Sequence, residues 1–507
     1  MERIRIQLLA FGIAFGLCPS SSHGAEVTAP RPPNVIFILA DDLGYGDLSC
    51  YGQTNFTTPN LDRLAKEGMK FTDFYAGCTV CAPSRSSLIT GLHTGHTPIR
   101  GNSERVPEGQ APLPAGANTL PKVLHAAGYV CGGFGKWGLG FIGTEGDPLA
   151  QGFDHFFGYN CQRWAHRYYP AYLWDDRRQF FLPGNDMRHK TTYAPAVIQQ
   201  RAEAFIQDNK DKPFFVYLAA TLPHAELLAP DDAILARFKG KFPEKPFAGW
   251  AGPWGGTAEY GPDAAPGGYC PQPMPRASYA AMVTHLDQQV GEILRLVDEL
   301  GLDNNTIILF SSDNGPHSEG GNDPHFFDSG GPLRGTKRDL YEGGIRVPML
   351  VRWPGHIAAG STSSLPAAFW DVLPTLAELA GLNAPKGLDG ISFAPTLLGK
   401  GEQARHDYLY WEFGEVNAGQ AVRAGDWKAI HFFAQPGKPE HTELYHLATD
   451  LGETIDVAGA HPEMVAAMHD RMRKAHRSNP LFLLPMDEGF VSPTDKRTKG
   501  RSRVIDD

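Results

Sequence analysis

Short, largely apolar runs that end abruptly in polar residues recur along this chain. Runs of this kind are typical of strands that are buried on both faces of a parallel sheet. Four of them are NVIFILA (34–40), YVCGGFG (129–135), PFFVYLAA (213–220) and NTIILFSS (305–312). The pattern predicts a strand at each of these places.

Segments with helical spacing of their apolar residues precede three of the runs, at 119–128, 194–209 and 276–301. Helices that alternate with buried strands predict a doubly wound α/β fold, with a mixed, mostly parallel sheet sandwiched by helices. Ligands bind such sheets beyond the carboxyl ends of the strands. The polar residues expected at that edge are Asp41, Asp42, Lys136, His224, Asp313 and Asn314.

The pattern changes after Pro385. HDYLYWEF (406–413), QAVRAGDWKAIHFF (420–433) and TELYHLATD (442–450) alternate and are rich in aromatic residues, which is typical of antiparallel strands, and residues 461–477 have helical spacing. The sequence therefore predicts a smaller C-terminal α+β domain. We expect a signal peptide at 1–25, a catalytic domain at 26–385, the C-terminal subdomain at 386–480 and a polar tail at 481–507.

The beginning of the chain resembles an export signal. Arg3 and Arg5 precede an apolar stretch at 6–17, and small residues follow up to Ala25. No later segment approaches the length of about 20 apolar residues that a membrane span requires. We therefore expect an exported protein, periplasmic or extracellular, without a membrane span. The formal net charge of −10 argues against a nucleic-acid partner.

Two aspartate-containing pairs follow predicted strands. Asp41-Asp42 and Asp313-Asn314 offer oxygen atoms without a His or Cys partner, which suits a hard cation such as Ca²⁺ or Mg²⁺. A single Asp pair is more often a cap or a turn. Two pairs at strand ends favour a metal site, because converging carboxylates would otherwise repel each other.

The segment CTVCAPSRSS (78–87) has three interpretations: a redox pair, half of a metal site, or a site that needs one cysteine. Pro83 predicts a helix that begins near Cys81, where anionic groups are stabilised. A thiol couple of Cys78 and Cys81 would suit a helix start but would not explain the carboxylates. A zinc site is disfavoured because no second CxxC or His pair follows.

The CAPSR motif resembles the Cys-x-Pro-Ser-Arg signature of the type I sulfatases, in which the Cys is oxidised to formylglycine. The resemblance, which favours the arylsulfatase A-like and N-acetylgalactosamine-6-sulfatase-like branch, extends over nearly the whole mature chain. It rests on DDLGYGDLSCYG, CAPSRSSLITG, GKWGLG, PHAE, SSDNGP, GTKRDLYEGGIRVP and LYHLATDLGETIDVA. It implies an alkaline-phosphatase-like domain, one Ca²⁺ ion, formylglycine at Cys81 and a formylglycine-generating or sulfatase-maturing enzyme as a partner.

The resemblance also implies roles for individual residues. The Ca²⁺ ligands would be Asp41, Asp42, modified Cys81, Asp313 and Asn314. Arg85 would steady the hydrated aldehyde, Lys136 and Lys337 would hold the sulfate oxygens, and His224 would protonate the leaving oxygen. One hydroxyl of the hydrate would attack sulfur, and the second would then allow sulfate to leave.

One position departs from the family pattern. Many members have GKWHLG where this chain has Gly138, so a histidine that bonds the hydrate is missing. Another histidine, such as His93, His96 or His317, fills the gap, or the position is dispensable here. Loss of catalysis is the third interpretation.

The segment QRWAHRYYPAYLWDD (162–176) is either an ordinary packed loop or a sugar-binding wall of aromatic and basic side chains. The candidate substrate contacts are Arg163, His166, His317, Arg334 and His96. We expect a sulfated carbohydrate substrate, of galactose or N-acetylgalactosamine type. The alternatives are a phosphate or phosphonate ester hydrolase of the same superfamily, a non-catalytic glycan-binding relative, and a thiol oxidoreductase.

Overall fold

The structure is a computed structural model that describes residues 31–105, 108–186, 189–249 and 268–491. The predicted signal peptide lies outside the described residues. From Pro32 onward the chain belongs to one compact unit. Among the helices of the described residues, none is long and apolar enough to cross a membrane.

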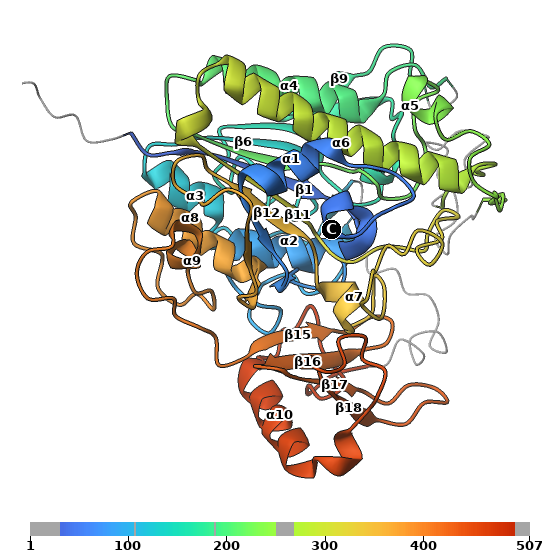
Figure 1. Ribbon diagram of the computed structural model, residues 1–507, viewed down its shortest axis with the longest axis vertical. Helices are drawn as coiled ribbons and strands as arrows, with labels where there is room; N and C mark the ends of the chain where they lie inside the picture. Colours follow the sequence, from blue (N-terminus) through green and yellow to red (C-terminus); the bar gives the residue numbers. More distant parts are fainter. Residues whose placement is uncertain (1–30, 106–107, 187–188, 250–267, 492–507) are drawn as a thin grey trace, which may run out of the picture. The chain divides into compact units, whose positions relative to one another are not determined.

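A ten-stranded sheet forms the centre of this unit (Figure 1). Its middle consists of the four predicted strands, which are parallel and adjacent in the order β11, β1, β10, β6. Their bounds are β1 Asn34–Ala40, β6 Val130–Lys136, β10 Phe214–Ala219 and β11 Thr306–Ser312. The prediction of these strands is therefore confirmed.

Shorter strands extend the sheet on both sides and make it mixed. Beyond β11 lie β12 (Met349–Arg352), β2 (Met69–Phe71) and β13 (Ser361–Ser363). Beyond β6 lie β7 (His155–Tyr159), β8 (Tyr172–Asp175) and β9 (Arg178–Phe181). The end of the aromatic segment 162–176 is thus an outer strand, antiparallel to β7.

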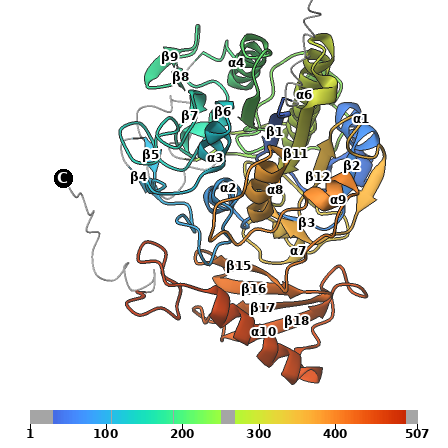
Figure 2. The ribbon, with the colours of Figure 1, turned by 90° about the vertical axis from the view of Figure 1, so that its left-hand side faces the viewer.

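Helices cover both faces of the sheet (Figure 2). Ile36 and Ile38 of β1 pack in one core with α1 (Pro59–Glu67), α4 (Ala194–Asp208), α5 (Ala233–Ala236) and α6 (Pro275–Glu299). Val35 and Phe37 pack in a second core with α2 (Cys81–Thr90), α3 (Leu120–Ala126), α8 (Val372–Leu379) and α9 (Ala394–Leu398). Because both faces of β1 are buried, its sequence is apolar at every position from 35 to 40.

The C-terminal part is a four-stranded antiparallel sheet with one helix, as predicted. It comprises β15 Leu409–Phe413, β16 Gly419–Ala424, β17 Trp427–Phe432, β18 His441–His446 and α10 Pro462–Ala475. One face of this sheet packs on α10 through Met468 and Met472. The other face packs on the segment before α2, where Cys78 and Val80 share a core with Trp411. The exact boundary at residues 385 and 386 stays a prediction.

Two short strand pairs and one short helix lie outside these two sheets. The pairs β3 (Phe74–Tyr75) with β14 (Ala367–Ala368) and β4 (Glu104–Arg105) with β5 (Gly109–Gln110) are two-stranded, and α7 spans Glu342–Ile345. The described part of the predicted polar tail, residues 481–491, includes Leu484, which is buried with Ala418 and Phe433.

Candidate active site

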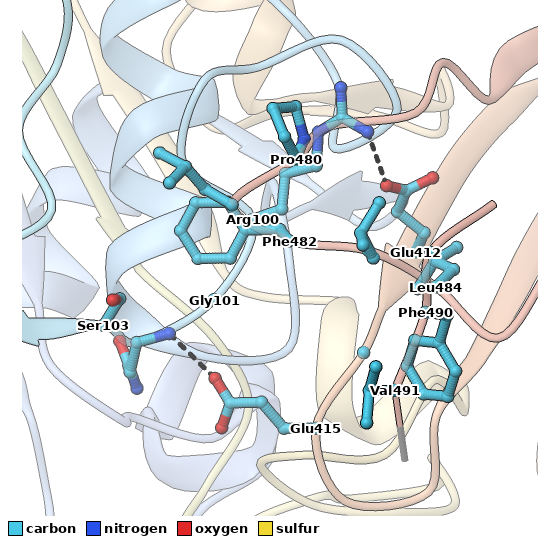
Figure 3. A pocket seen from close by; sticks show the side chains of 15 residues that line it. Arg100, Gly101, Ser103, Glu412, Glu415, Pro480, Phe482, Leu484, Phe490 and Val491 are labelled. Carbon is cyan, nitrogen blue, oxygen red and sulfur yellow. Dashed lines mark hydrogen bonds and ion pairs between the residues drawn. The ribbon is translucent and has the colours of Figure 1, made fainter. Parts of the chain in front are cut away.

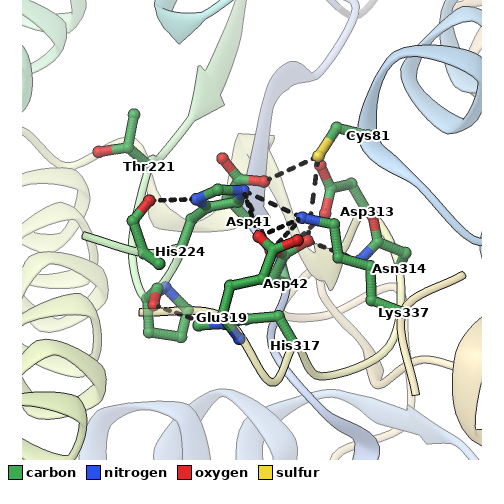
Figure 4. Close-up of polar contacts among 12 residues, drawn as sticks. Asp41, Asp42, Cys81, Thr221, His224, Asp313, Asn314, His317, Glu319 and Lys337 are labelled. Carbon is green, nitrogen blue, oxygen red and sulfur yellow. Dashed lines mark hydrogen bonds and ion pairs between the residues drawn. The ribbon is translucent and has the colours of Figure 1, made fainter. Parts of the chain in front are cut away.

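The carboxyl ends of the central strands bring the predicted catalytic and metal residues together. Figure 4 shows seven of them: Asp41, Asp42, Cys81, His224, Asp313, Asn314 and Lys337. Strand β1 leads to the two aspartates, β6 ends at Lys136, β10 leads to the loop of His224, and β11 leads to Asp313 and Asn314. Helix α2 begins at Cys81 and adds Arg85 one turn later. These side chains, like Lys337 from a later loop, are buried.

Asp42 holds the two aspartate pairs in contact. Its φ of 63° lies in the left-handed region, which Asp tolerates better than most residues. Its backbone N–H donates to Oδ1 of Asp313 at 3.0 Å, and its Oδ1 accepts from Nδ2 of Asn314 at 2.7 Å. The backbone conformation thus aims both pairs at one point.

Each of the three carboxylates has a cationic partner. Nζ of Lys136 lies 2.7 Å from Oδ2 of Asp41, and Nζ of Lys337 lies 2.8 Å from Oδ2 of Asp42. Nη2 of Arg85 lies 2.8 Å from Oδ2 of Asp313, and Nη1 of Arg85 donates to the Lys136 carbonyl at 2.7 Å. Arg85 therefore ties helix α2 to the end of β6.

The charge of this cluster is not fully balanced at Asp313. Burial raises the pKa of Asp313 to about 7, and repulsion by Asp41 adds to this, although Arg85 opposes it. Burial also opposes ionisation of Asp42, but Lys337 and His224 outweigh it and lower the pKa of Asp42. A further positive charge beside Asp313 would stabilise its ionised carboxylate and lower its pKa.

The oxygen atoms present fit a hard cation. Oδ1 of Asn314 is buried without a hydrogen-bond partner, and Oδ1 of Asp41 faces the thiol of Cys81 at 3.4 Å. Ligand atoms of Asp41, Asp42, Cys81 and His224 lie close enough together to hold an ion. His224 is the poorer ligand of these, because its Nε2 contacts the ammonium group of Lys337 at 3.0 Å. Carboxylate and amide oxygens are the ligands that Ca²⁺ prefers.

Cys81 is an unreactive thiol in this setting. Burial raises its pKa well above the ordinary value, although Lys136 opposes the shift. Burial also raises the pKa of Cys78 to about 12, and its Sγ contacts the Glu412 carbonyl at 3.7 Å. The six cysteines that the structure describes are all free. Two protonated, buried thiols give a thiol oxidoreductase no support, because the thiolate is the reactive form.

Lys337, His224 and Glu319 form a second charged group beside Asp42. Nδ1 of His224 is hydrogen-bonded to the Ala225 carbonyl, so this nitrogen carries the proton and Nε2 accepts from Lys337. Oε2 of Glu319 lies 3.2 Å from Nζ of Lys337. Burial and Lys337 lower the pKa of His224 to about 4. The sequence analysis missed Glu319, whose only signal was its place two residues after His317.

Two of the predicted substrate residues lie at this group. The ring of His166 stacks on His224 with centroids 4.3 Å apart, and Tyr269 lies against both rings. His317 also stacks on His224, at 5.7 Å. Both nitrogens of His317 are used, because Nε2 donates to the Pro223 carbonyl and Nδ1 accepts from the Glu319 N–H.

The structure places the other three candidates elsewhere. Arg334 donates to the Tyr445 hydroxyl and the Glu453 carbonyl, in the C-terminal part. His96 is paired with Asp389 at 2.8 Å. Arg163 is half-buried and lies 3.4 Å from Glu104.

No described histidine takes the position beside Gly138. His93 stacks on His96 and faces Asp389, and His317 is fully engaged as described above. The side chain next to Gly138 is that of Gln162, whose Nε2 lies at the place that a Cβ of residue 138 would take. Gly138 itself has a φ of +73°.

A cavity of about 360 Å³ lies near the start of α2, between residues 100–103 and residues 480–491 (Figure 3). Asn102 connects it to helix α2, because its Oδ1 accepts from the Ala82 N–H at 3.2 Å. The Asn102 N–H in turn donates to Glu415 at 2.8 Å. Phe482 and Phe490 form an apolar wall of this cavity.

Comparison with known families agrees with this geometry. The family model described as Sulfatase matches residues 33–382. A second family model, described as N-sulphoglucosamine sulphohydrolase, C-terminal, matches residues 335–478.

Individual relatives cover most of the chain. Human arylsulfatase A is 35% identical over 497 residues, which cover 88% of this chain and 88% of the relative. Human N-acetylgalactosamine-6-sulfatase is 31% identical over 485 residues, with 87% and 84% covered. The crystal structure of Ps i-CgsB in complex with k-i-k-neocarrahexaose superposes with a TM-score of 0.72 at 27% identity, covering 90% of this chain and 96% of that one.

Proposed function

Because this chain belongs to the sulfatase family and is thus a sulfuric ester hydrolase, we propose that its substrate is a carbohydrate sulfate of galactose or N-acetylgalactosamine type. We further propose that Cys81 is converted to formylglycine and that one Ca²⁺ ion binds beside it. The observation that carries both is the convergence of three carboxylates, Asn314 and three cationic side chains on the start of α2.

The residues that would hold Ca²⁺ are Asp41, Asp42, Asp313 and Asn314, with residue 81 completing the set. When bound, the ion would offset the carboxylate charge, and formylglycine would supply an oxygen nucleophile where the Sγ of Cys81 now lies. The unpartnered Oδ1 of Asn314 and the raised pKa of Asp313 support this assignment.

Lys136 and Lys337 would hold the sulfate group from two sides. They form ion pairs with different carboxylates, Asp41 and Asp42, which keep both ammonium groups charged and fixed in position. The Coulombic effect of these carboxylates outweighs burial and raises the pKa of both lysines. Fixed cations of this kind stabilise negative charge that develops in a transition state.

The proton for the leaving oxygen would come from the pair of Lys337 and His224. His224 alone is neutral near pH 7, since its pKa is about 4 and its Nε2 is an acceptor. Nζ of Lys337, which carries protons, lies 3.0 Å from that nitrogen. We therefore assign the general acid to the pair of Lys337 and His224. The proton passes from Nζ of Lys337 to the leaving oxygen, either directly or by way of Nε2 of His224.

The sugar assignment rests on the surroundings of the cluster. His166 and Tyr269 offer ring faces beside His224, and stacking on such faces is a common way to bind sugar rings. One relative is named for N-acetylgalactosamine 6-sulfate hydrolysis, and the Ps i-CgsB structure contains k-i-k-neocarrahexaose. We extend the proposal to export into the periplasm or the medium and to maturation by a formylglycine-generating or sulfatase-maturing enzyme.

The test is anion release from a defined panel by protein whose residue 81 is verified as the aldehyde by peptide mass. The panel contains galactose, N-acetylgalactosamine, glucosamine and uronate sulfates, an aryl sulfate, and matched phosphate and phosphonate esters. We expect sulfate from one galactose-type sugar, and none from a Cys81→Ala variant. Release of phosphate at a higher rate would favour the ester-hydrolase alternative, and binding without release would favour the glycan-binding one.

A further inference from the structure

Two glutamines stand out in the part of the chain that the structure describes. Both amide atoms of Gln110 and of Gln162 are buried and have no hydrogen-bond partner. Their side chains are 1% and 5% exposed. Burial of an unpaired amide destabilises a fold, so such groups in a native protein call for an explanation.

Gln162 lies at the carboxyl edge of the central sheet. It follows β7 by three residues and fills the space left by the missing side chain of Gly138, which is two residues past Lys136. The Gly138 N–H donates to the Asn160 carbonyl at 3.0 Å, which fixes the two segments side by side. Oδ1 of Asn160 is also buried and unpaired.

Gln110 comes to the same region from another element. In the β4–β5 pair it stands opposite Glu104, so the two side chains share a face. Glu104 lies 3.4 Å from Nε of Arg163, the residue after Gln162. Leu113 also donates its N–H to the Leu139 carbonyl, which ties the segment after β5 to the one that contains Gly138.

We propose that Gln110, Asn160 and Gln162 form a neutral hydrogen-bonding subsite for the hydroxyl groups of the sugar that carries the sulfate. The inference rests on the proposed function and adds a specificity determinant to it. A sulfate group offers only acceptors and would leave the amide oxygens unpaired. Sugar hydroxyls both donate and accept, so they match unpaired N–H and C=O groups together.

The test compares two substrates in one protein. The Gln162→Met and Gln110→Met variants keep the side-chain length but remove the amide, and kcat/KM is measured for the preferred sugar sulfate and for 4-nitrophenyl sulfate, which has no hydroxyl. We expect the sugar-to-aryl ratio of kcat/KM to fall about 10- to 100-fold in each variant. The matched control is Gln199→Met, a buried glutamine in α4 whose Nε2 is bonded to Glu203 and Gln289. Its ratio should stay at the wild-type value.

Other outcomes overturn the proposal. An unchanged ratio would show that the amides hold only water. An equal loss on both substrates would assign them to the sulfate group or to the fold, and a lowered melting temperature would identify the fold as the cause. Wild-type protein that cleaves the aryl ester but no sugar sulfate would instead refute the proposed carbohydrate function, a result visible with the unsubstituted protein alone.

Discussion

Lys337 contacts three polar groups of the candidate site at once. Its ammonium group lies within 3.2 Å of Asp42, His224 and Glu319. It thereby serves two purposes in the proposed reaction, as a sulfate contact and as the proton reservoir beside His224.

We expect Lys337→Met to lower kcat/KM by about 10²- to 10³-fold, because a fixed charge next to the reacting group is lost. The pKa of His224 should rise, since Lys337 is the charge that lowers it most. A pH profile of kcat/KM on the mature enzyme measures both effects. Lys239→Met removes a half-exposed lysine paired with Asp231 and is the control. A profile that keeps its shape would contradict the shared-proton assignment.

His93 gives a second prediction at this scale, away from catalysis. Burial lowers its pKa to about 3, although Asp389 opposes the shift. Between about pH 3 and 6.5 the unfolded chain takes up a proton at this residue and the folded protein does not. The free energy of unfolding should therefore rise with pH over this range.

The His93→Gln variant lacks this titrating group, so its free energy of unfolding should rise less steeply with pH. The difference should correspond to the uptake of one proton. Denaturant unfolding measured from pH 4 to 8 checks it, with exposed His189 replaced in the control. An unchanged slope would mean that His93 titrates normally in the folded protein.

At the scale of elements, the turn after β6 is set by Gly138. We expect Gly138→Ala to cost about 1–2 kcal/mol of stability, because a side chain is strained at positive φ. Gly128→Ala should cost about the same, since Gly128 has a φ of +81° and open space around it.

The two variants should differ in activity. Only the new Cβ at position 138 displaces the Gln162 amide, which is the end of a flexible side chain, so only that variant should lose sugar specificity. Chemical denaturation together with the substrate comparison separates the two effects. A much larger stability loss at position 138 would show that the amide has no room to move.

The elements also show which features a sequence can predict. Asp41, Asp42, Asp313 and Asn314 end long apolar runs, so the local pattern alone predicts that they meet at one sheet edge. Glu319 and Gln162 lie in loops whose paths depend on distant contacts, and no local pattern distinguishes them. Arg334 is the opposite case. Its position close to Lys337 in the sequence makes it a candidate for the site, but its side chain is hydrogen-bonded to Tyr445 in the C-terminal part.

At the scale of the whole molecule, a buried lysine links the C-terminal sheet to helix α7. Nζ of Lys428 in β17 lies 3.0 Å from Glu342 of α7 and 2.9 Å from Glu453. All three side chains are fully buried. Glu342 also contacts Arg346 at 3.1 Å, so this group joins the C-terminal sheet to the segment just after Lys337.

We expect Lys428→Met to destabilise the protein by about 3–5 kcal/mol, because two buried carboxylates lose their shared cation. Burial raises the pKa of Glu453 to about 7, and Glu342 adds to this shift. Since the protonated carboxyl needs no cation, the loss should be smaller at pH 5 than at pH 8. Thermal unfolding at both pH values checks this, and the exposed Lys474→Met variant serves as the control.

The packing of the C-terminal sheet against Cys78 and Val80 also limits when another protein can reach Cys81. Cys81 is 2% exposed, and the strands that cover the segment before it come from residues 409–446, which a ribosome makes long after Cys81. If Cys81 is converted to formylglycine as proposed, the maturing enzyme would have to reach it before those strands dock. Docking of the C-terminal sheet would therefore end the period in which Cys81 is accessible, and a chain that folds before this oxidation would keep the buried thiol.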